Sequence, residues 1–405
     1  MMGVGDDAID AELATLIDRE TRRRAQTLQL VAGETVASPA VRRILATPLA
    51  DTYAEGYPGA RYHGGCEVVD EIEELAIARA ASLFGAEYVN VQPVSGTAAG
   101  SAVYAAFAQP GDPVLSLRLD HGGHQTHGSR ANFSGRWFTT IRYAVGEVDE
   151  LVDYDQIRDL ALLHRPRLLV AGSATYSRLF DFPTLRQIAD EAECILWVDA
   201  AHLGGLVAGG VAPSPVPHAD VVTMVTHKVL RGPRGGLLLG ADRHRAALQK
   251  AVFPFTQGAP SMHVIAAKAA TFAEAATATH AHYVSRTVEN ARALAAALTE
   301  RGLRIVSGGT DTHLAVVDVS ATGLSGVQAQ QRLHDAGIVV DKAVLPFEHR
   351  PVAEGSAIRI GTPIATLAGA DAAAMTQIAD WMVAALSDPS QHARIRGSVA
   401  ELLGG

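Results

Sequence analysis

The sequence predicts an α/β protein, in which a mostly parallel β-sheet covered by helices on both faces is followed by a smaller α+β unit. Three observations predict this architecture. From about residue 80, short apolar segments alternate with helical stretches and glycine-rich turns. These segments are apolar on both faces, which is typical of strands buried in a parallel sheet. After about residue 301 the order changes to strand, strand, helix, strand, strand, as in a small α+β unit.

The first unit follows an N-terminal helix expected over residues 7–30, where Ile9, Leu13, Leu16 and Ile17 recur at helical spacing. Each expected strand is short and leads through a turn into a helical stretch. The expected strands are residues 89–91, 113–117, 168–171, 195–198, 221–225 and 236–239. Their apolar character places them side by side in one buried sheet.

The second unit follows a long Ala-rich helical region at residues 262–301. Its expected strands and helices are residues 303–306, 313–317, 338–340 and 358–360, and residues 325–336 and 369–386, respectively. A chain of 405 residues exceeds the size at which one hydrophobic core stops growing, so two domains are expected. We divide the chain into an arm at residues 1–50, a large domain at residues 51–270 and a small domain at residues 271–405.

Composition argues against several classes of protein. The net charge is −9 and the pI is about 6.0, whereas a nucleic-acid-binding protein shows a basic face. Its one basic run, Arg22 to Arg24, is typical of a solvated helix. Cys66 and Cys194 have no metal-ligand spacing, so no metal site is expected. No apolar stretch reaches the ~20 residues of a membrane span and no signal peptide opens the chain, so a cytoplasmic protein is expected.

The first chemical signal is the triplet Ser95-Gly96-Thr97, which follows the expected strand 89–91 and opens an Ala-rich helix. Free N–H groups and the positive end of the helix dipole make such a turn a site for a phosphate group. Alone, the triplet is better explained as an ordinary helix N-cap.

Two charged residues at strand ends follow. Asp199 ends the strand 195–198 at the sheet edge where ligands bind, and a carboxylate there is suited to keep a pyridine nitrogen protonated. An Asp that caps the next helix explains this residue equally well. Lys228 comes directly after the buried strand 221–225, and burial lowers the pKa of a lysine and makes it a nucleophile toward an aldehyde. The alternative, a surface lysine, is disfavoured by the buried strand.

The order of these three features indicates one cofactor. A phosphate turn, a strand-end carboxylate and a strand-end lysine follow one another as expected of a pyridoxal 5'-phosphate enzyme with the large-domain fold of aminotransferases. Five further stretches are specific and collinear: Tyr53 to Gly59, His121 to Gly128, Thr226 to Lys228, Pro260 to Ile265 and Ile358 to Pro363. Through them the chain resembles the serine hydroxymethyltransferase family over nearly its whole length. The resemblance implies the fold type I architecture, with a seven-stranded mostly parallel sheet in the large domain and a small α+β C-terminal domain.

The resemblance also implies a pyridoxal phosphate site. Lys228 would carry the cofactor as a Schiff base, and Asp199 would pair with the ring nitrogen. His124 would stack on the ring, and His202 would lie near the phenolic oxygen. The remaining cofactor-binding positions are Ser95, Gly96 and Thr97 around the phosphate, with Thr226 and His227 beside Lys228.

A substrate site and a homodimer are implied in the same way. Arg359 would bind the substrate carboxylate, and Glu55 would move the proton at the β-hydroxyl with Tyr53 close to it. Tyr53, Glu55 and Tyr62 would reach the neighbouring subunit's site, which implies a homodimer or a tetramer of two dimers. The expected reaction is a retro-aldol and aldol sequence on a β-hydroxy amino acid, with the cofactor stabilising a glycyl carbanion.

Several positions near the substrate depart from the family's usual residues. Gly33 replaces a serine, and Ala174 replaces a residue that gives a hydroxyl to the phenolic oxygen. Phe255 and Thr256 replace paired glycines that approach the partner chain's phosphate. His63 replaces a catalytic-site tyrosine and is either a proton-transfer group or a hydrogen-bonded structural histidine.

Two further departures touch tetrahydrofolate. Gln125 replaces a leucine that packs on folate, and Ala343 replaces an asparagine that reads the pteridine, so hydrogen bonds to that ring are lost. With Phe255 and Thr256, these changes favour a folate-independent transaldolase or aldolase that passes the glycyl unit of L-threonine or L-serine to another aldehyde. One alternative is a tetrahydrofolate-dependent serine or α-methylserine hydroxymethyltransferase. Another is an inactive homologue kept as a scaffold or regulator, which is disfavoured by the joint retention of Lys228, Asp199, His124 and Glu55.

Overall fold

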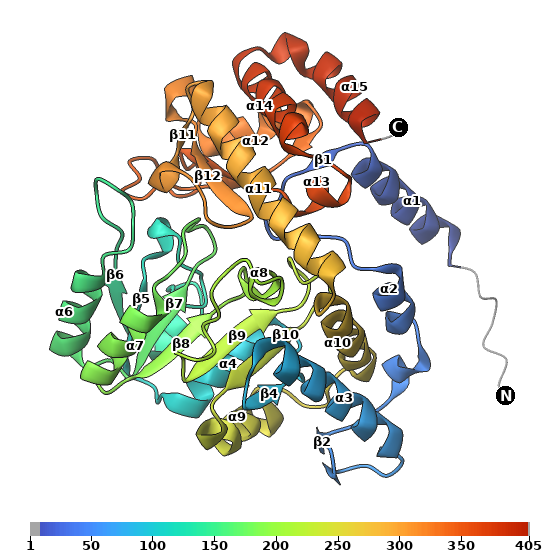
Figure 1. Cartoon of the computed structure of the whole chain (residues 1–405), viewed down its shortest axis with the longest axis vertical. Helices are drawn as coiled ribbons and strands as arrows, with labels where there is room; N and C mark the ends of the chain where they lie inside the picture. The colour runs from blue at the N-terminus through green and yellow to red at the C-terminus, as the bar shows by residue number, and fades with distance from the viewer. Residues whose placement is uncertain (1–8, 404–405) are drawn as a thin grey trace.

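The computed structural model describes residues 9–403 as two layered bodies, each built around its own sheet (Figure 1). In the view of Figure 1 the body with the larger sheet lies below and the body with the smaller sheet lies above. The long helix α11 (Ala278–Glu300) runs from the upper body toward the lower one. Among the described residues, no helix has both the length and the apolar character needed to cross a membrane.

The larger sheet has seven strands in the order β4-β10-β9-β8-β7-β5-β6. Their bounds are Tyr88–Asn90 (β4), Pro113–Leu117 (β5), Thr139–Tyr143 (β6), Leu168–Gly172 (β7), Ile195–Asp199 (β8), Val221–Val225 (β9) and Gly236–Gly240 (β10). Only β10 runs antiparallel to its neighbours, so the predicted mostly parallel sheet is confirmed. The strand missing from the six expected ranges is β6, an edge strand that is half exposed and has no apolar run.

Both faces of this sheet are covered by helices, as the apolar strands predicted. Along β8, Leu196 and Val198 belong to one hydrophobic cluster, whereas Trp197 between them belongs to another on the opposite face. The first face is covered by α3 (Glu67–Phe84), α6 (Tyr154–His164), α7 (Phe182–Glu191), α8 (Gly204–Ala208) and α10 (Met262–Ala275). The second face is covered by α4 (Gly96–Phe107) and α9 (Arg245–Lys250), and α5 (Ser134–Trp137) lies before β6. The strand ends therefore emerge between two helical layers.

The smaller sheet is antiparallel, with the strand order β11-β12-β15-β14. Its strands are Arg304–Ile305 (β11), Leu314–Asp318 (β12), Asp341–Ala343 (β14) and Ala357–Gly361 (β15). The helices of this body are α11, α12 (Gly326–Asp335), α13 (Pro363–Leu367), α14 (Ala372–Ser387) and α15 (His392–Leu402). The predicted small α+β unit is confirmed, whereas the division of the chain at residues 50 and 270 stays a prediction.

The expected N-terminal helix was too long, whereas the expected helical region at residues 262–301 is confirmed as two helices. Helix α1 covers Ala11–Ala25, so the prediction of a helix through residue 30 was wrong at that end, and residues 7–8 lie outside the described part. The chain leaves the helix because Leu28 and Leu30 are buried in the core of the upper body, where β1 (Leu28–Gln29) pairs with β13 (Ile338–Val339). The helical region 262–301 is divided between α10 and α11, because Thr277 caps the start of α11. Between α1 and α3 lie α2 (Pro39–Leu45), β2 (Gly56–Tyr57) and β3 (Ala60–Arg61).

Candidate active site

The site forms at the carboxyl edge of the larger sheet, where two neighbouring parallel strands end. Asp199 is the last residue of β8, and Lys228 lies three residues beyond the end of β9. The two strands are paired, with Asp199 opposite Thr223. Because the carboxyl ends of parallel strands meet at one edge, the aspartate and the lysine predicted from sequence are brought to the same place.

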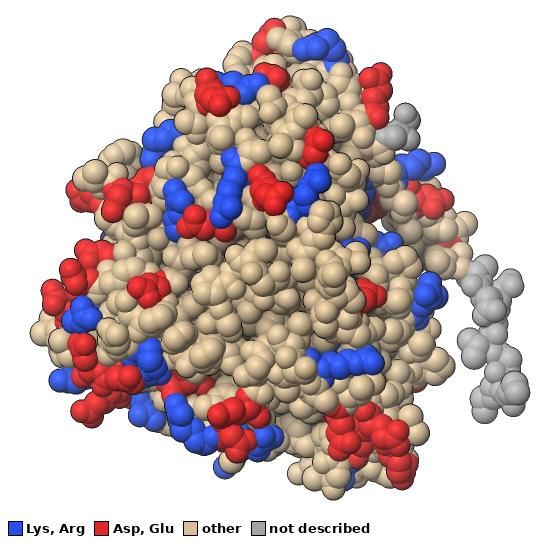
Figure 2. Space-filling view, viewed as in Figure 1, with Lys and Arg blue, Asp and Glu red and all other residues tan. Residues whose placement is uncertain are grey.

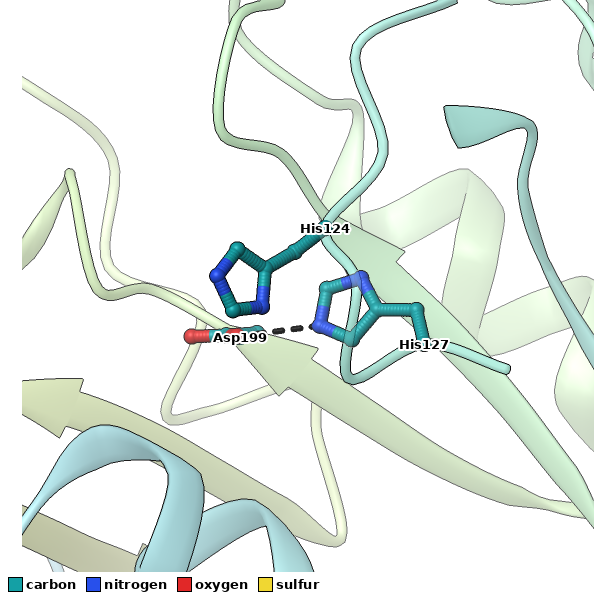
Figure 3. A group of neighbouring side chains, drawn as sticks. All are labelled: His124, His127 and Asp199. Carbon is teal, nitrogen blue, oxygen red and sulfur yellow. Dashed lines mark hydrogen bonds and ion pairs between the residues drawn. The ribbon is translucent and has the colours of Figure 1, made fainter. Parts of the chain in front are cut away.

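Asp199 is held as an anion by two histidines of the loop after β5. His127 Nε2 lies 3.0 Å from Asp199 Oδ2 (Figure 3). Burial alone would raise the pKa of Asp199, but the hydrogen bond from His127 and the charges of His127 and His124 lower it to about 2. The ionised carboxylate accepts this bond and the imidazole donates it. His127 was missed in the sequence, although its spacing of three residues from His124 was a signal.

His124, His127 and Asp199 form the cluster drawn in Figure 3. One nitrogen of each histidine and one oxygen of Asp199 lie within 4.8 Å of one another, a grouping that is also compatible with a metal ion. All three side chains are already hydrogen-bonded, since His127 contacts Asp199 and His124 Nδ1 lies 2.7 Å from the Thr126 hydroxyl. The His124 ring is exposed beside the carboxylate. We interpret the cluster as one wall of a site that binds a flat, cationic ring.

Lys228 is the nucleophile that the strand context predicted. Burial lowers the pKa of its ammonium group to about 8, helped by the charges of Arg359 and Arg234 and opposed by those of Asp199 and Asp341. A substantial neutral fraction is therefore present near neutral pH. Thr226 beside it is buried and donates its hydroxyl to the Pro233 carbonyl at 2.6 Å, which fixes the turn.

The histidine that precedes Lys228 is uncharged. Burial lowers the pKa of His227 to about 4, with the charges of Arg234 and Lys228 acting in the same direction. Its Nδ1 atom is buried and has no hydrogen-bond partner among the described residues. Such an atom is available to a bound ligand.

The Ser95-Gly96-Thr97 turn begins helix α4, next to the end of β9. Ser95 is the N-cap, and its hydroxyl accepts a hydrogen bond from the Ala98 N–H at 3.0 Å. The first N–H groups of a helix have no acceptor within it, so those of Gly96 and Thr97 remain for an anion. A Cβ on Gly96 would lie 2.6 Å from Val225 Cγ1, so glycine is needed for this close approach to β9. The capping and anion-binding interpretations are therefore compatible.

A buried lysine that was not identified from the sequence stabilises this turn. Lys268, in α10, is almost fully buried, and its Nζ donates to the carbonyls of Val91 (2.5 Å), Pro93 (3.1 Å) and Gly236 (2.7 Å). Val91 and Pro93 lead into the phosphate turn, and Gly236 begins β10. The signal was a single lysine within an otherwise apolar helical segment. Lys268 therefore fixes the turn relative to the sheet.

A pair of neutral histidines closes one side of the site. His202 Nδ1 lies 3.3 Å from His313 Nε2, and the two rings are stacked with centroids 5.4 Å apart. Burial, with the charges of Lys228 and Arg359, lowers the pKa of His202 well below its usual range. Burial and the Lys228 charge lower the pKa of His313 to about 3. His313 directly precedes β12, so the smaller sheet reaches the site.

Arg359 comes from β15 of the smaller sheet and is already engaged. Its Nε and Nη2 donate to Asp341 Oδ2 at 3.0 and 2.5 Å, and its Nη1 donates to the Ala174 carbonyl at 2.6 Å. Asp341 lies directly opposite Arg359 across the β14–β15 pair. The departure at Ala174 removes a hydroxyl, yet the backbone of this residue still contacts the site arginine.

The residues expected to serve the neighbouring subunit form a separate group. His63 Nε2 lies 3.3 Å from Glu55 Oε2, and the His63 and Tyr53 rings meet edge to face with centroids 5.4 Å apart. Tyr62 is exposed and its ring contacts Phe253. Among the described residues, none of these four side chains has a hydrogen bond or ring contact with the cluster around Lys228. The structure thus brings the predicted residues together in two groups.

The positions that depart from the family pattern differ in their surroundings. Ala343 is buried in a small apolar cluster with Val306, Val316 and Ala357. A Cβ on Gly33 would lie 3.9 Å from Lys228 Cε, so this glycine borders the reactive lysine. Gln125 lies at an exposed loop position, whereas Phe255 and Thr256 are exposed and half-buried, respectively, in the π-helical segment Ala251–Thr256. Only Gly33 and Ala174 contact Lys228 or Arg359 closely.

The donor set fits pyridoxal 5'-phosphate. The open helix N-terminus at Gly96 is suited to the phosphate, and the Asp199 anion is suited to a protonated ring nitrogen. Lys228, with its lowered pKa, is suited to the aldehyde. The unpartnered Nδ1 of His227 leaves one further polar contact for a ligand.

Comparisons with known proteins agree with this fit. A sequence model of the family described as serine hydroxymethyltransferase matches residues 7–382. The serine hydroxymethyltransferase of Acidobacterium capsulatum is 48% identical over 396 residues, covering 97% of this chain and 93% of that protein. That of Koribacter versatilis is 47% identical with the same coverage. Serine hydroxymethyltransferase 1 of Pseudomonas fluorescens is 49% identical over 386 residues, covering 95% of this chain and 94% of that protein.

Proposed function

The chain belongs to the serine hydroxymethyltransferase family, and from that premise we propose that it breaks and forms the Cα–Cβ bond of a β-hydroxy amino acid, with glycine as the product or acceptor. Pyridoxal 5'-phosphate is the proposed cofactor and L-serine or L-threonine the proposed donor. One observation carries the proposal: a lysine of lowered pKa and an anionic aspartate lie at the ends of adjacent strands, with Arg359 across from them.

Each cofactor-binding residue has a task that its surroundings support. Ser95, Gly96 and Thr97 hold the phosphate at the N-terminus of α4, and Asp199 keeps the ring nitrogen protonated. His124 covers one face of the ring, and neutral His202 offers a hydrogen bond near the phenolic oxygen. When bound, the cofactor supplies an electron sink for the charge that develops at the substrate's α-carbon. Thr226 and His227 complete the pocket around Lys228.

The substrate is positioned by Arg359, whose guanidinium binds the α-carboxylate and aligns the breaking bond. Glu55 moves the proton at the β-hydroxyl, and His63, which lies within 3.3 Å of it, holds or exchanges that proton. Tyr53 and Tyr62 are both exposed. Tyr53, Glu55 and His63 contact one another, and Tyr62 contacts Phe253, rather than the cluster around Lys228 of their own chain. We therefore propose that these four side chains complete the site of a second subunit in a homodimer.

Shared sites make a complementation test possible. A Lys228→Ala variant lacks the nucleophile and a Glu55→Gln variant lacks the proton-transfer group. If the sites are shared, mixing the two inactive variants restores activity, because a mixed dimer has one site with both groups intact. Activity that stays absent after subunit exchange, with mixed dimers verified by mass, contradicts the shared site.

Two reactions are compatible with this site: transfer of a one-carbon unit from serine to tetrahydrofolate, and transfer of the glycyl unit to another aldehyde. Similarity to serine hydroxymethyltransferases along the whole chain supports transfer from serine to tetrahydrofolate. A folate-independent transaldolase or aldolase is favoured by Ala343, since an apolar cluster surrounds the position from which an asparagine would read the pteridine. Exposed Gln125, in place of a leucine, also favours the folate-independent reaction. We place the folate-dependent reaction first, because the overall similarity outweighs a few altered positions.

The deciding experiment measures glycine formation from L-serine and from L-threonine by the cofactor-loaded protein, with and without tetrahydrofolate. Serine turnover that requires folate identifies a hydroxymethyltransferase. Acetaldehyde release from threonine that ignores folate identifies the transaldolase or aldolase. Glycine that forms at the same rate with the Lys228→Ala control contradicts the proposed function. A protein that binds the cofactor but turns over neither donor supports an inactive homologue.

A further inference from the structure

We propose that Asp341 sets the specificity of the Arg359 site by competing with the substrate's carboxylate for the same guanidinium. This inference rests on the proposed role of Arg359 in binding the α-carboxylate. It concerns how strongly the site binds any carboxylate and how the charge of Asp341 affects Lys228.

The arginine has two edges that can bind a carboxylate with two parallel hydrogen bonds. The edge made by Nε and Nη2 is occupied, because both atoms donate to Oδ2 of Asp341. On the other edge, Nη1 donates to the Ala174 carbonyl at 2.6 Å. A substrate carboxylate therefore meets a guanidinium that already holds an anion on one edge and a carbonyl on the other.

The competing position of Asp341 is fixed by the sheet. Asp341 and Arg359 are directly opposite each other on β14 and β15, so their side chains share one face. Lys342, the next residue along β14, donates instead to the carbonyls of Val352 and Ala353 at 3.1 and 2.6 Å, and it does not neutralise Asp341. The anion beside Arg359 is therefore part of the fold.

Two carboxylates at one guanidinium repel each other. The substrate must either displace Asp341 or accept a binding site whose positive charge is partly neutralised. Ligands with a single carboxylate then bind more weakly than they would at a free arginine, and ligands with a second carboxylate nearby are disfavoured further. The inferred substrate class is β-hydroxy amino acids whose side chain is neutral or cationic.

The charge of Asp341 also reaches the reactive amine. Burial shifts the pKa of Lys228, as do the charges of Asp199, Arg359, Asp341 and Arg234. The charge of Asp341 raises this pKa. Removing this carboxylate should therefore lower the pKa of Lys228. That change is visible without catalysis, in the pH dependence with which the cofactor-free protein captures pyridoxal phosphate.

The test compares Asp341→Asn with Asp318→Asn. Asp318 is a matched control, because it pairs across the strands with Arg304 in the same sheet, with its Oδ2 3.0 Å from Arg304 Nε. Glycine is titrated into the cofactor-loaded proteins and its dissociation constant is read from calorimetry. We expect Asp341→Asn to bind glycine about fivefold more tightly, because a like charge is removed from a half-buried site. The midpoint for cofactor capture moves to lower pH in Asp341→Asn alone.

A second variant, Asp341→Ser, guards against an effect peculiar to asparagine and should change glycine binding in the same direction. Unchanged or weaker glycine binding in both Asp341 variants overturns the inference, since Asp341 would then orient Arg359 or have no influence. An Arg359→Met variant separates this failure from failure of the proposed function. If Arg359→Met binds glycine as the unaltered protein does, Arg359 is not the carboxylate site and both proposals fall. If Arg359→Met binds weakly while the Asp341 variants do not bind more tightly, only the inference falls.

Discussion

The Nε2–H of His127 donates to Oδ2 of Asp199 over 3.0 Å, from a histidine that is almost completely buried. This bond holds the carboxylate at the edge of the sheet and is the foremost favourable contribution to its low pKa of about 2. A buried neighbour therefore maintains the anion that the proposed ring site requires.

Replacement of His127 by leucine should weaken cofactor binding. A hydrogen bond to a charged group is lost, which corresponds to about 10- to 100-fold in affinity. The dissociation constant of pyridoxal phosphate is measured by quenching of intrinsic fluorescence during titration of the cofactor-free protein. A His164→Leu variant, which alters a histidine at the end of α6 away from the site, serves as the control. Equal affinity in the His127 variant and the control would show that the bond does not support the ring site.

Cofactor capture by the cofactor-free protein should accelerate as the pH rises through about 8, the pKa to which burial and neighbouring charges bring Lys228. Below this pH the side chain is an ammonium group without a free electron pair, and above it the amine is neutral and nucleophilic. The rate is followed by absorbance after rapid mixing, from one pH unit below that value to one above. The Lys228→Ala variant provides the baseline. A rate that stays flat across this range contradicts the assignment of Lys228 as the reacting amine.

Replacement of Lys268 by methionine should destabilise the fold and loosen the phosphate turn together. Three carbonyls lose their donor, and the expected decrease in the free energy of unfolding is about 2–4 kcal/mol. Urea unfolding measures the stability, and inorganic phosphate binding to the cofactor-free protein reports on the turn. The control is Lys250→Met, because Lys250 is exposed at the end of α9. If phosphate binding is retained while stability falls, Lys268 has a structural role alone.

The Arg61 ion pairs should contribute far more to the free energy of unfolding than a surface ion pair does. Arg61 donates to Asp70 and Glu73 at 2.7 Å each and to the carbonyls of Ala54 and Gly56 at 2.9 Å. Burial raises the pKa of Glu73 despite this partner, so Arg61→Met leaves a buried carboxylate unpaired. The free energy of unfolding should fall by about 3–5 kcal/mol near neutral pH.

The matched change for Arg61 is Arg158→Met, which removes a half-exposed pair with Glu191 and should cost less than about 1 kcal/mol. The loss in Arg61→Met should also shrink as the pH falls, because an unpaired Glu73 avoids the penalty by taking up a proton. Urea unfolding at several pH values checks both expectations. A loss that is the same at low and neutral pH would mean that Glu73 is not the group left unpaired.

The residues at strand ends were predictable from sequence because their signal is local. Asp199 and Lys228 each follow an apolar run, and Ser95 opens a helix, so order along the chain sufficed. The roles of His127 and Asp341 could not be predicted in this way, although His127 lies three residues from His124 and Asp341 follows the apolar run 338–340. These roles come from partners that only the folded chain brings close. In the same way, Leu28 pairs with a strand more than 300 residues away, and this tertiary contact ended a helix that local periodicity continued.

Lys228 follows a strand of the larger sheet and Arg359 lies in the smaller sheet, and the two sheets have separate hydrophobic cores. A substrate that binds at both Lys228 and Arg359 would therefore connect two bodies that are packed independently. Ligand binding should make their unfolding more cooperative, so that the two parts melt as one. It should also slow amide hydrogen exchange along β15, the strand that carries Arg359. Cooperative unfolding of the two bodies would then indicate that the site is occupied.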